Sequence, residues 1–320
     1  MAATSPLPEH PAVEPSRHRA RRALRRRWSL VAALVALVVL AGACDLQLLT
    51  PEGPGPMRYR DEVFGAVTTT SGITYGSAVS QTGVTQSLAL DLYRPTGDTL
   101  TERPAIIWVH GGSFKFGSRT SPEIVDEATT FAKKGYVTVS ISYRLSTNGC
   151  TNPATAECLE AIADAREDAQ AAVRWLRANE ATYGIDTTRI AIGGSSAGAI
   201  TALNVGYGPE TPGSSGNPGY PSDVRAAVSL SGARVLTTPN PGEAAALLFH
   251  GTADPLVPYS AATNTVAAAE AAGLPVFLTT WEGGGHVPYA THRTEILDQT
   301  TNFLFWTLDL ANAAGCCAPV

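Results

Sequence analysis

The chain has 320 residues, of which 44% are hydrophobic and 16% are charged, so it can bury a large core. Its formal net charge is −5 at pH 7, which is the opposite of the clustered positive charge that phosphate binding requires. Nucleic acid is therefore excluded as an expected partner. An α/β architecture can use this much chain in a single domain.

The N-terminal residues 1–43 have the composition of an export signal. An apolar run, "LVAALVALVVLA", spans residues 30–41 and is followed by the small residues "GAC". The run is shorter than the roughly 20 residues that a membrane span needs, so a cleaved signal is favoured over an anchoring helix. The basic region that precedes it contains seven arginines: Arg17, Arg19, Arg21, Arg22, Arg25, Arg26 and Arg27.

Two processing routes lead to a mature N-terminus at Cys44. Residues 41–43 fit the A-x-A pattern of ordinary signal cleavage. The stretch "LAGAC" also resembles a bacterial lipoprotein box, in which lipidated Cys44 would attach the protein to a membrane. The choice stays open, and the expected location is either secreted or anchored to the cell envelope. The mature chain has 16 Lys and Arg against 26 Asp and Glu.

The signal is followed by a predicted Pro/Gly linker at residues 44–60, which includes "TPEGPGP". The catalytic domain is predicted over residues 61–312, with a C-terminal tail at 313–320. Within the domain, residues 88–95 ("LALDLYRP") alternate between leucine and other residues. This period of two predicts an antiparallel strand.

The next segments predict buried parallel strands separated by helices. A helix is predicted between the first two strands, because "SPEIVDEATTFAKKG" has Ser and Pro at its start and Gly at its end. A second long amphipathic helix is predicted over 161–184 and a third near Ala197. This alternation predicts an α/β fold with a mostly parallel central sheet and helices on both faces. The buried strands are expected at 105–112, 136–143, 189–194, 226–232, 245–251 and 275–285.

A Gly/Pro/Ser-rich loop spans residues 206–223. We interpret it either as a rim of the functional site or as a flexible connection.

The stretch "GGSSAGA" at 193–199 presents two adjacent serines directly after a predicted strand and before a predicted helix. Ser196 has Gly194 and Gly198 at the positions where a tight strand-to-helix turn needs them, and Ser195 does not. Ser196 is therefore the candidate nucleophile. The N-terminus of the following helix offers free backbone N–H groups to a developing negative charge.

A base and an acid are expected at the ends of later strands. Asp254 lies in "HGTADPLVPY" and His286 in "GGGHVPY". The order Ser196, Asp254, His286 is that of the α/β-hydrolase triad. The weaker alternatives are His110, His250 and His292 for the base, and Asp223 and Asp298 for the acid.

These four motifs ("HGGSF", "GSSAG", "HGTADPLVPY" and "GGGHVPY") resemble the α/β-hydrolase superfamily, in particular carboxylesterases and lipases of the bacterial feruloyl- and acetyl-esterase-like group. The resemblance extends over roughly residues 60–310. It implies Ser196 as nucleophile, His286 as general base and acid, and Asp254 as the group that orients His286. It further implies an oxyanion hole formed by the N–H groups of Gly112, Ser113 and Ala197. Many relatives have a third glycine where this chain has Ser113.

The expected function is therefore that of a serine hydrolase that cleaves carboxylic esters without a metal or cofactor. Small-molecule esters and esters on polysaccharide both remain open as substrates. Two alternatives are a peptidase related to prolyl oligopeptidases and a catalytically inactive binding protein on the same scaffold.

The five cysteines lack the spacing of a zinc site. In an exported protein, Cys150 and Cys158 are predicted to form a local disulfide, whereas the partners of Cys316 and Cys317 cannot be read from the sequence.

Overall fold

The computed structural model describes residues 48–150, 154–208, 210 and 213–316. The predicted export signal, Cys44 and Cys317 lie outside these residues. Within the part that is described, none of the helices combines the length and the apolar character needed to cross a membrane.

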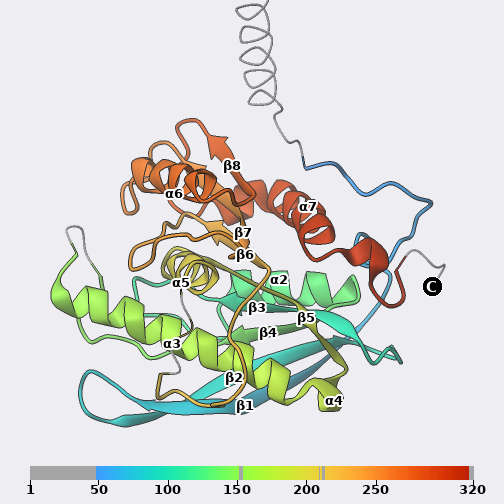
Figure 1. Cartoon of the computed structure of the whole chain (residues 1–320), viewed down its shortest axis with the longest axis horizontal. Coiled ribbons are helices and arrows are strands. Elements are labelled where there is room, and N and C mark those ends of the chain that lie inside the picture. Colours follow the sequence, from blue (N-terminus) through green and yellow to red (C-terminus); the bar gives the residue numbers. More distant parts are fainter. Residues whose placement is uncertain (1–47, 151–153, 209, 211–212, 317–320) are drawn as a thin grey trace, which may run out of the picture. The chain divides into compact units, whose positions relative to one another are not determined.

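Eight strands form one sheet in the order β1-β2-β4-β3-β5-β6-β7-β8, which runs from the bottom to the top of Figure 1. The first two strands pair antiparallel with each other and β2 pairs antiparallel with β4, whereas all later neighbours are parallel. The predicted antiparallel strand and the mostly parallel sheet are both confirmed. The strands are β1 (Val67–Val79), β2 (Thr85–Pro95), β3 (Arg103–Val109), β4 (Val137–Ile141), β5 (Ile185–Ser195), β6 (Ala226–Leu230), β7 (Ala245–Gly251) and β8 (Val276–Trp281).

Helices cover both faces of the sheet. Successive side chains of a strand point to opposite faces, so the apolar buried strands present an apolar surface on each side. In β3, Ile107 packs into one core and Trp108 into the other. The first core also contains residues of α3, α5 and α6, and the second contains residues of α2 and α7. The helices are α2 (Pro122–Lys133), α3 (Ala156–Ala178), α4 (Glu180–Tyr183), α5 (Ala197–Gly206), α6 (Tyr259–Ala271), α7 (Tyr289–Thr307) and the short η1 (Leu310–Asn312).

The predicted boundaries of the catalytic domain need correction at both ends. The predicted linker extends to residue 60, but Met57 and Tyr59 are buried in the core beneath α2 and α7. At the other end, Ala313 belongs to the same core, and the Tyr59 hydroxyl donates to the carbonyl of Ala314. The compact unit accordingly begins at Leu48. The sequence prediction failed here because short Pro/Gly-rich segments show no periodicity even when they pack against a core.

Within the 206–223 loop, residues 213–223 form neither a rim of the site nor a loose connection. Ser215 is fully buried, its hydroxyl donates to Asp168 of α3, and its carbonyl accepts from the N–H of Ser77 in β1. The Arg144 guanidinium pairs with the same Asp168 carboxylate. The loop is therefore held against α3 and β1, where a buried ion pair needs additional hydrogen-bond partners.

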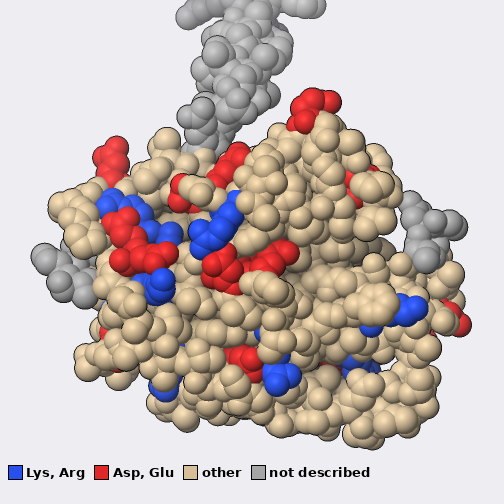
Figure 2. All heavy atoms as spheres, turned by 180° about the vertical axis from the view of Figure 1, so that it is seen from behind, with Lys and Arg blue, Asp and Glu red and all other residues tan. Residues whose placement is uncertain are grey.

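The surface carries mixed charge. On the face seen in Figure 2, Lys and Arg side chains lie among Asp and Glu side chains rather than in one basic patch. An ion pair also joins two helices that pack into the same core, since Arg293 of α7 pairs with Asp126 of α2.

Candidate active site

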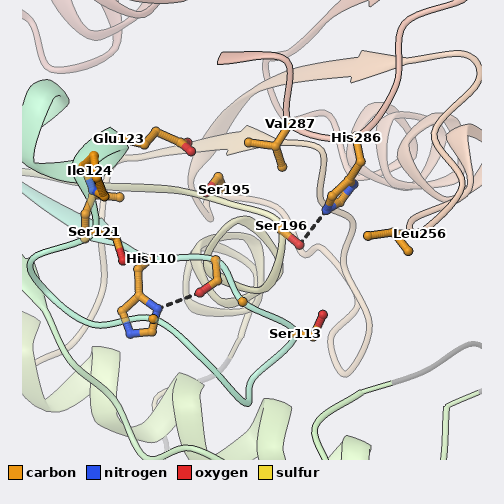
Figure 3. A pocket seen from close by; sticks show the side chains of 14 residues that line it. His110, Ser113, Ser121, Glu123, Ile124, Ser195, Ser196, Leu256, His286 and Val287 are labelled. Atoms are coloured by element: carbon orange, nitrogen blue, oxygen red, sulfur yellow. Dashed lines mark hydrogen bonds between the residues drawn. The ribbon is translucent and has the colours of Figure 1, made fainter. Parts of the chain in front are cut away.

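The three residues predicted as a triad lie together beyond the carboxyl ends of parallel strands, where open α/β sheets place their ligand sites. Ser196 follows β5 directly, Asp254 lies three residues beyond β7, and His286 lies in the loop between β8 and α7. Residues separated by up to 90 positions thus meet at one edge of the sheet. Figure 3 shows His286 pointing at Ser196 across the mouth of a cavity.

The turn that carries Ser196 is strained. Its φ of 51° and ψ of −115° lie outside the regions that residues with a side chain ordinarily adopt. The Ser196 N–H donates to the Leu230 carbonyl at 2.8 Å, which ties the turn to the end of β6. Two glycines let the turn approach β3, because a Cβ at Gly194 or Gly198 would overlap the carbonyl oxygen of Val109.

Replacing Gly198 by alanine is therefore expected to displace Ser196. The new Cβ meets backbone rather than a flexible side chain, so the turn itself must shift. We expect a loss of about 1–3 kcal/mol in the free energy of unfolding and a loss of on the order of 100-fold in kcat/KM. Urea unfolding and ester hydrolysis measure the two effects. Gly65→Ala is the matched control, because nothing lies within 4 Å of a Cβ at Gly65; equal effects of the two variants would contradict the argument.

His286 connects the other two residues. Its Nδ1 lies 2.7 Å from Oδ2 of Asp254, and its Nε2 lies 2.8 Å from Oγ of Ser196. A neutral imidazole has one N–H and one lone-pair nitrogen. With the proton on Nδ1, the ring donates to the carboxylate and accepts the Ser196 hydroxyl proton at the same time.

Asp254 is fixed by more than its contact with His286. Its side chain is fully buried, and Oδ1 accepts the backbone N–H groups of Leu256 and Val257 at 2.9 and 3.0 Å. The ring of His250 packs beside it, with Nε2 at 2.9 Å from the Val257 carbonyl and 3.3 Å from Asp254 Oδ2. His250 therefore braces the loop that carries the acid.

The other histidines and acids that the sequence left as candidates make contacts with residues outside the triad. His110 is fully buried, with Nδ1 2.7 Å from the Gly111 carbonyl, and it stacks on Tyr143 at 4.3 Å. Burial lowers the pKa of His110 to about 4, so it is neutral at pH 7. His292 stacks on Trp281 and contacts Glu295. Asp223 pairs with Arg177, and Asp298 is exposed on α7.

The predicted oxyanion residues flank Ser196 on two segments. Ala197 is the first residue of α5, so its N–H has no acceptor one turn earlier in the helix. Gly112 and Ser113 follow β3 with φ values of 117° and 54°. The left-handed conformation of Ser113 is one that glycine adopts without strain, so a serine here carries a conformational cost that glycine would not.

Two cavities open on either side of Ser196. The first, of about 420 Å³, is lined by residues that include His110, Glu123, Ser196, His286 and Val287. We call it the imidazole cavity because the His286 ring forms part of its wall. The second, of about 590 Å³, is mainly apolar, and we call it the disulfide cavity; its lining includes Ser113, Ala197, Cys150, Cys158, Ile162 and Val235.

The Cys150–Cys158 disulfide is present and lies beside the oxyanion segment. The N–H of Cys150 donates to the Ser113 carbonyl at 2.9 Å, and the N–H of Ser146 donates to the Phe114 carbonyl at 2.8 Å. The disulfide thus links the start of α3 to a segment that holds the strained residues of the candidate oxyanion hole.

Replacing both Cys150 and Cys158 by serine is expected to lower the free energy of unfolding by roughly 2.6 kcal/mol, from the loop entropy of the unfolded chain. Urea unfolding with and without a reducing agent measures this. The reducing agent should shift the curve of the wild-type protein further than that of the double variant. A wild-type curve unaffected by complete reduction would contradict the expectation.

One supporting residue had no signal in the sequence. Ser231 follows β6, is fully buried, and its Oγ accepts the N–H of Val287 at 3.0 Å. It therefore fixes the residue directly after His286. A lone serine after a strand does not show which loop it will contact, because that contact joins positions 56 residues apart.

Within the described residues there is no group of three or more His, Cys, Asp or Glu side chains arranged to hold a metal ion.

Comparison with known proteins gives the same assignment of fold. The BD-FAE family model matches residues 90–233. Carboxylesterase 3B of Mus musculus is 33% identical over 129 residues, which is 38% of this chain and 21% of the mouse protein. Phenmedipham hydrolase of Pseudarthrobacter oxydans is 35% identical over 118 residues, or 36% of this chain and 22% of that protein. The chain thus spans about a fifth of the length of these curated relatives.

Among solved structures, native esterase 2 of Thermogutta terrifontis superposes with a TM-score of 0.62 at 23% identity, covering 81% of this chain and 98% of that one. The same esterase phosphoramylated by tabun gives 0.63, also at 23% identity, over 82% of this chain and 98% of that one. Strand order and this structural similarity show that the chain has the α/β-hydrolase fold of these esterases, and residues 90–233 are similar to the BD-FAE family.

Proposed function

We propose that the protein is a serine esterase that hydrolyses carboxylic esters through an acyl-enzyme intermediate. The observation that carries this proposal is the continuous line of contacts from Asp254 through His286 to Ser196, at the junction of the two cavities. The nucleophile, the base and the group that orients the base stand within hydrogen-bond distance of one another.

The mechanism follows from this geometry. Ser196 Oγ attacks the ester carbonyl while His286 Nε2 takes its proton. The N–H groups of Gly112, Ser113 and Ala197 stabilise the negative charge that develops on the carbonyl oxygen. His286 then returns the proton to the leaving alcohol. Water activated by the same imidazole hydrolyses the acyl-Ser196 ester and regenerates the serine.

The two cavities divide the substrate between them. The leaving alcohol must receive its proton from His286, so it belongs in the imidazole cavity, which the His286 ring lines. The acyl chain then belongs in the remaining cavity at Ser196, the disulfide cavity, whose mainly apolar wall can receive a hydrocarbon chain. Its volume of about 590 Å³ suits a short or medium acyl chain. Related structures described as butyrate-bound and propionate-bound support acyl groups of this size.

We also propose that the protein acts outside the cytoplasm. This rests on the export signal at residues 1–43 and on the two processing patterns that end at Cys44. Intact mass of the protein purified from its producing cell tests both routes. A mature N-terminus other than Cys44 would overturn the cleavage site, and a Cys44 without a diacylglycerol increment would overturn lipidation alone.

A panel of p-nitrophenyl esters from acetate to decanoate, run beside peptide p-nitroanilides, tests the proposed activity. We expect hydrolysis of the esters, highest for short or medium acyl chains, and little cleavage of the anilides. Paraoxon should inactivate the protein and add one diethylphosphoryl group to Ser196, as a related structure is described as phosphorylated by paraoxon. A folded protein that hydrolyses no ester and takes up no phosphoryl group would be a binding protein instead.

A further inference from the structure

An uncompensated carboxyl group lies on the wall of the imidazole cavity. It belongs to Glu123, in the first turn of α2. Figure 3 shows the Glu123 carboxyl pointing toward the space between Ser195 and Val287, across from His286. Its Oε1 is buried and has no hydrogen-bond partner among the described residues. A buried oxygen of this kind is costly unless something pairs with it.

Nothing that lines the cavity neutralises this carboxyl. Among the described residues of its wall there is no Lys or Arg, and His110 is neutral at pH 7 because burial lowers its pKa to about 4. Position 123 is favourable for an acid because the N-terminus of a helix attracts negative charge. That role accounts for an acid in the first turn, but an acid turned toward solvent would serve it equally well.

None of the described groups near Glu123 brings an uncompensated positive charge, and burial raises the pKa of Glu127 well above its usual value. On its own helix, Glu127 lies one turn further on, almost fully buried, and Asp126 beside it pairs with Arg293 and Tyr289 of α7. From β5, the Ser195 hydroxyl contacts the Glu123 carboxyl, and His286 faces it from the loop after β8. Burial raises the pKa of Glu123 to about 7, and the Ser195 hydroxyl opposes the rise.

We propose that Glu123 is a specificity-determining residue, which selects esters whose alcohol portion carries either a cationic ammonium group or a neutral hydrogen-bond donor such as a hydroxyl group. This rests on the proposed function, because that function places the alcohol in the imidazole cavity. A hydroxyl donor satisfies the carboxyl oxygen that the protein leaves without a partner, and an ammonium group attracts the ionised carboxylate by its charge. An alcohol portion bearing a carboxylate is rejected, since two like charges would share one partly buried site.

The selectivity for a cation depends on pH, with a definite sign. Below about pH 7 the Glu123 carboxyl is protonated and carries no charge. Above that pH it is an anion and attracts an ammonium group. The preference for a cationic alcohol over a neutral one of the same shape therefore rises as the pH rises. A factor that changes both rates equally cancels in their ratio.

Two pairs of butyrate esters test the proposal. The choline ester and the 3,3-dimethylbutyl ester have the same shape and differ in a permanent charge; the 4-hydroxybutyl and pentyl esters differ in a neutral donor. For wild-type protein we expect the choline to dimethylbutyl ratio of kcat/KM to be on the order of tenfold at pH 8.5 and to fall toward one at pH 5.5. In Glu123→Gln the ratio should be low and flat across this range.

Glu102→Gln is the matched control. Glu102 is exposed and precedes β3, at the edge of the sheet opposite the site, so its removal changes net charge equally without touching the cavity. We expect the wild-type ratio and its pH dependence to persist in this variant. Discrimination in the hydroxyl pair alone, lost in Glu123→Gln, would identify the donor as a hydroxyl. Ratios of both pairs unchanged by Glu123→Gln would overturn the proposal.

A binding measurement separates this inference from the proposed function. Choline and 3,3-dimethylbutanol are titrated calorimetrically into Ser196→Ala protein at pH 8.5, with and without Glu123→Gln. Tighter binding of choline that depends on Glu123 supports the site even if every ester in the panel resists hydrolysis. Equal binding of the two alcohols, together with active hydrolysis, would overturn the cation preference and leave the esterase assignment intact.

Discussion

Replacing Ser196 by alanine is expected to lower kcat for ester hydrolysis by on the order of 10⁶, as removal of the nucleophile does in serine proteases. The Ser196 hydroxyl is the oxygen within 2.8 Å of His286 Nε2, so alanine leaves the base with nothing to activate. The small side chain also relieves none of the strain of the turn, because alanine still carries a Cβ at a φ of 51°. Hydrolysis of p-nitrophenyl butyrate, with unfolding measured in parallel, checks the result.

Ser195→Ala is the matched control for this prediction. Ser195 is the last residue of β5 and is 4% exposed, and the described contacts of its hydroxyl are with the Glu123 side of the imidazole cavity. We expect its loss to change kcat less than tenfold. If turnover were abolished in Ser195→Ala and retained in Ser196→Ala, the nucleophile would be Ser195, and the assignment to Ser196 would be wrong.

Asp254→Asn is expected to lower kcat by on the order of 10⁴, the size of loss seen when the triad acid of a serine protease is changed in this way. Asparagine can still accept the N–H groups of Leu256 and Val257 through its oxygen. Its NH₂ group then faces His286 Nδ1 and donates to it. The imidazole must carry its proton on Nε2 instead, and in that tautomer it cannot accept the proton of Ser196.

The controls for this variant are Asp223→Asn and Asp298→Asn, the two other acids that the sequence left as candidates. Both side chains are exposed, and neither has a described contact with His286. We therefore expect kcat to stay near the wild-type value. The double variant Ser196→Ala/Asp254→Asn should be no worse than Ser196→Ala alone, because both changes disable one unit. Additive losses would show that Asp254 acts outside the triad.

The sequence alone predicted the strands from β2 to β8, the helices α2, α3 and α5, and the three residues that meet at the site, but it predicted neither β1 nor α6. These predictions succeeded because each depends on neighbouring positions: periodicity shows which strands are buried on both faces, and Gly194 and Gly198 flank Ser196 within one turn. The carboxyl ends of parallel strands meet at one edge, so residues that directly follow such strands are brought together by the topology itself.

Only the tertiary structure decided which distant segments touch. Met57 and Tyr59 belong to the core, the 213–223 segment packs on α3 and β1, and Ser231 holds the loop of His286. Glu123 resembles any acid at the start of a helix until β5 and the His286 loop enclose it in a cavity. Such contacts depend on packing and burial between residues far apart in the chain, and the local pattern of side chains carries no record of that environment.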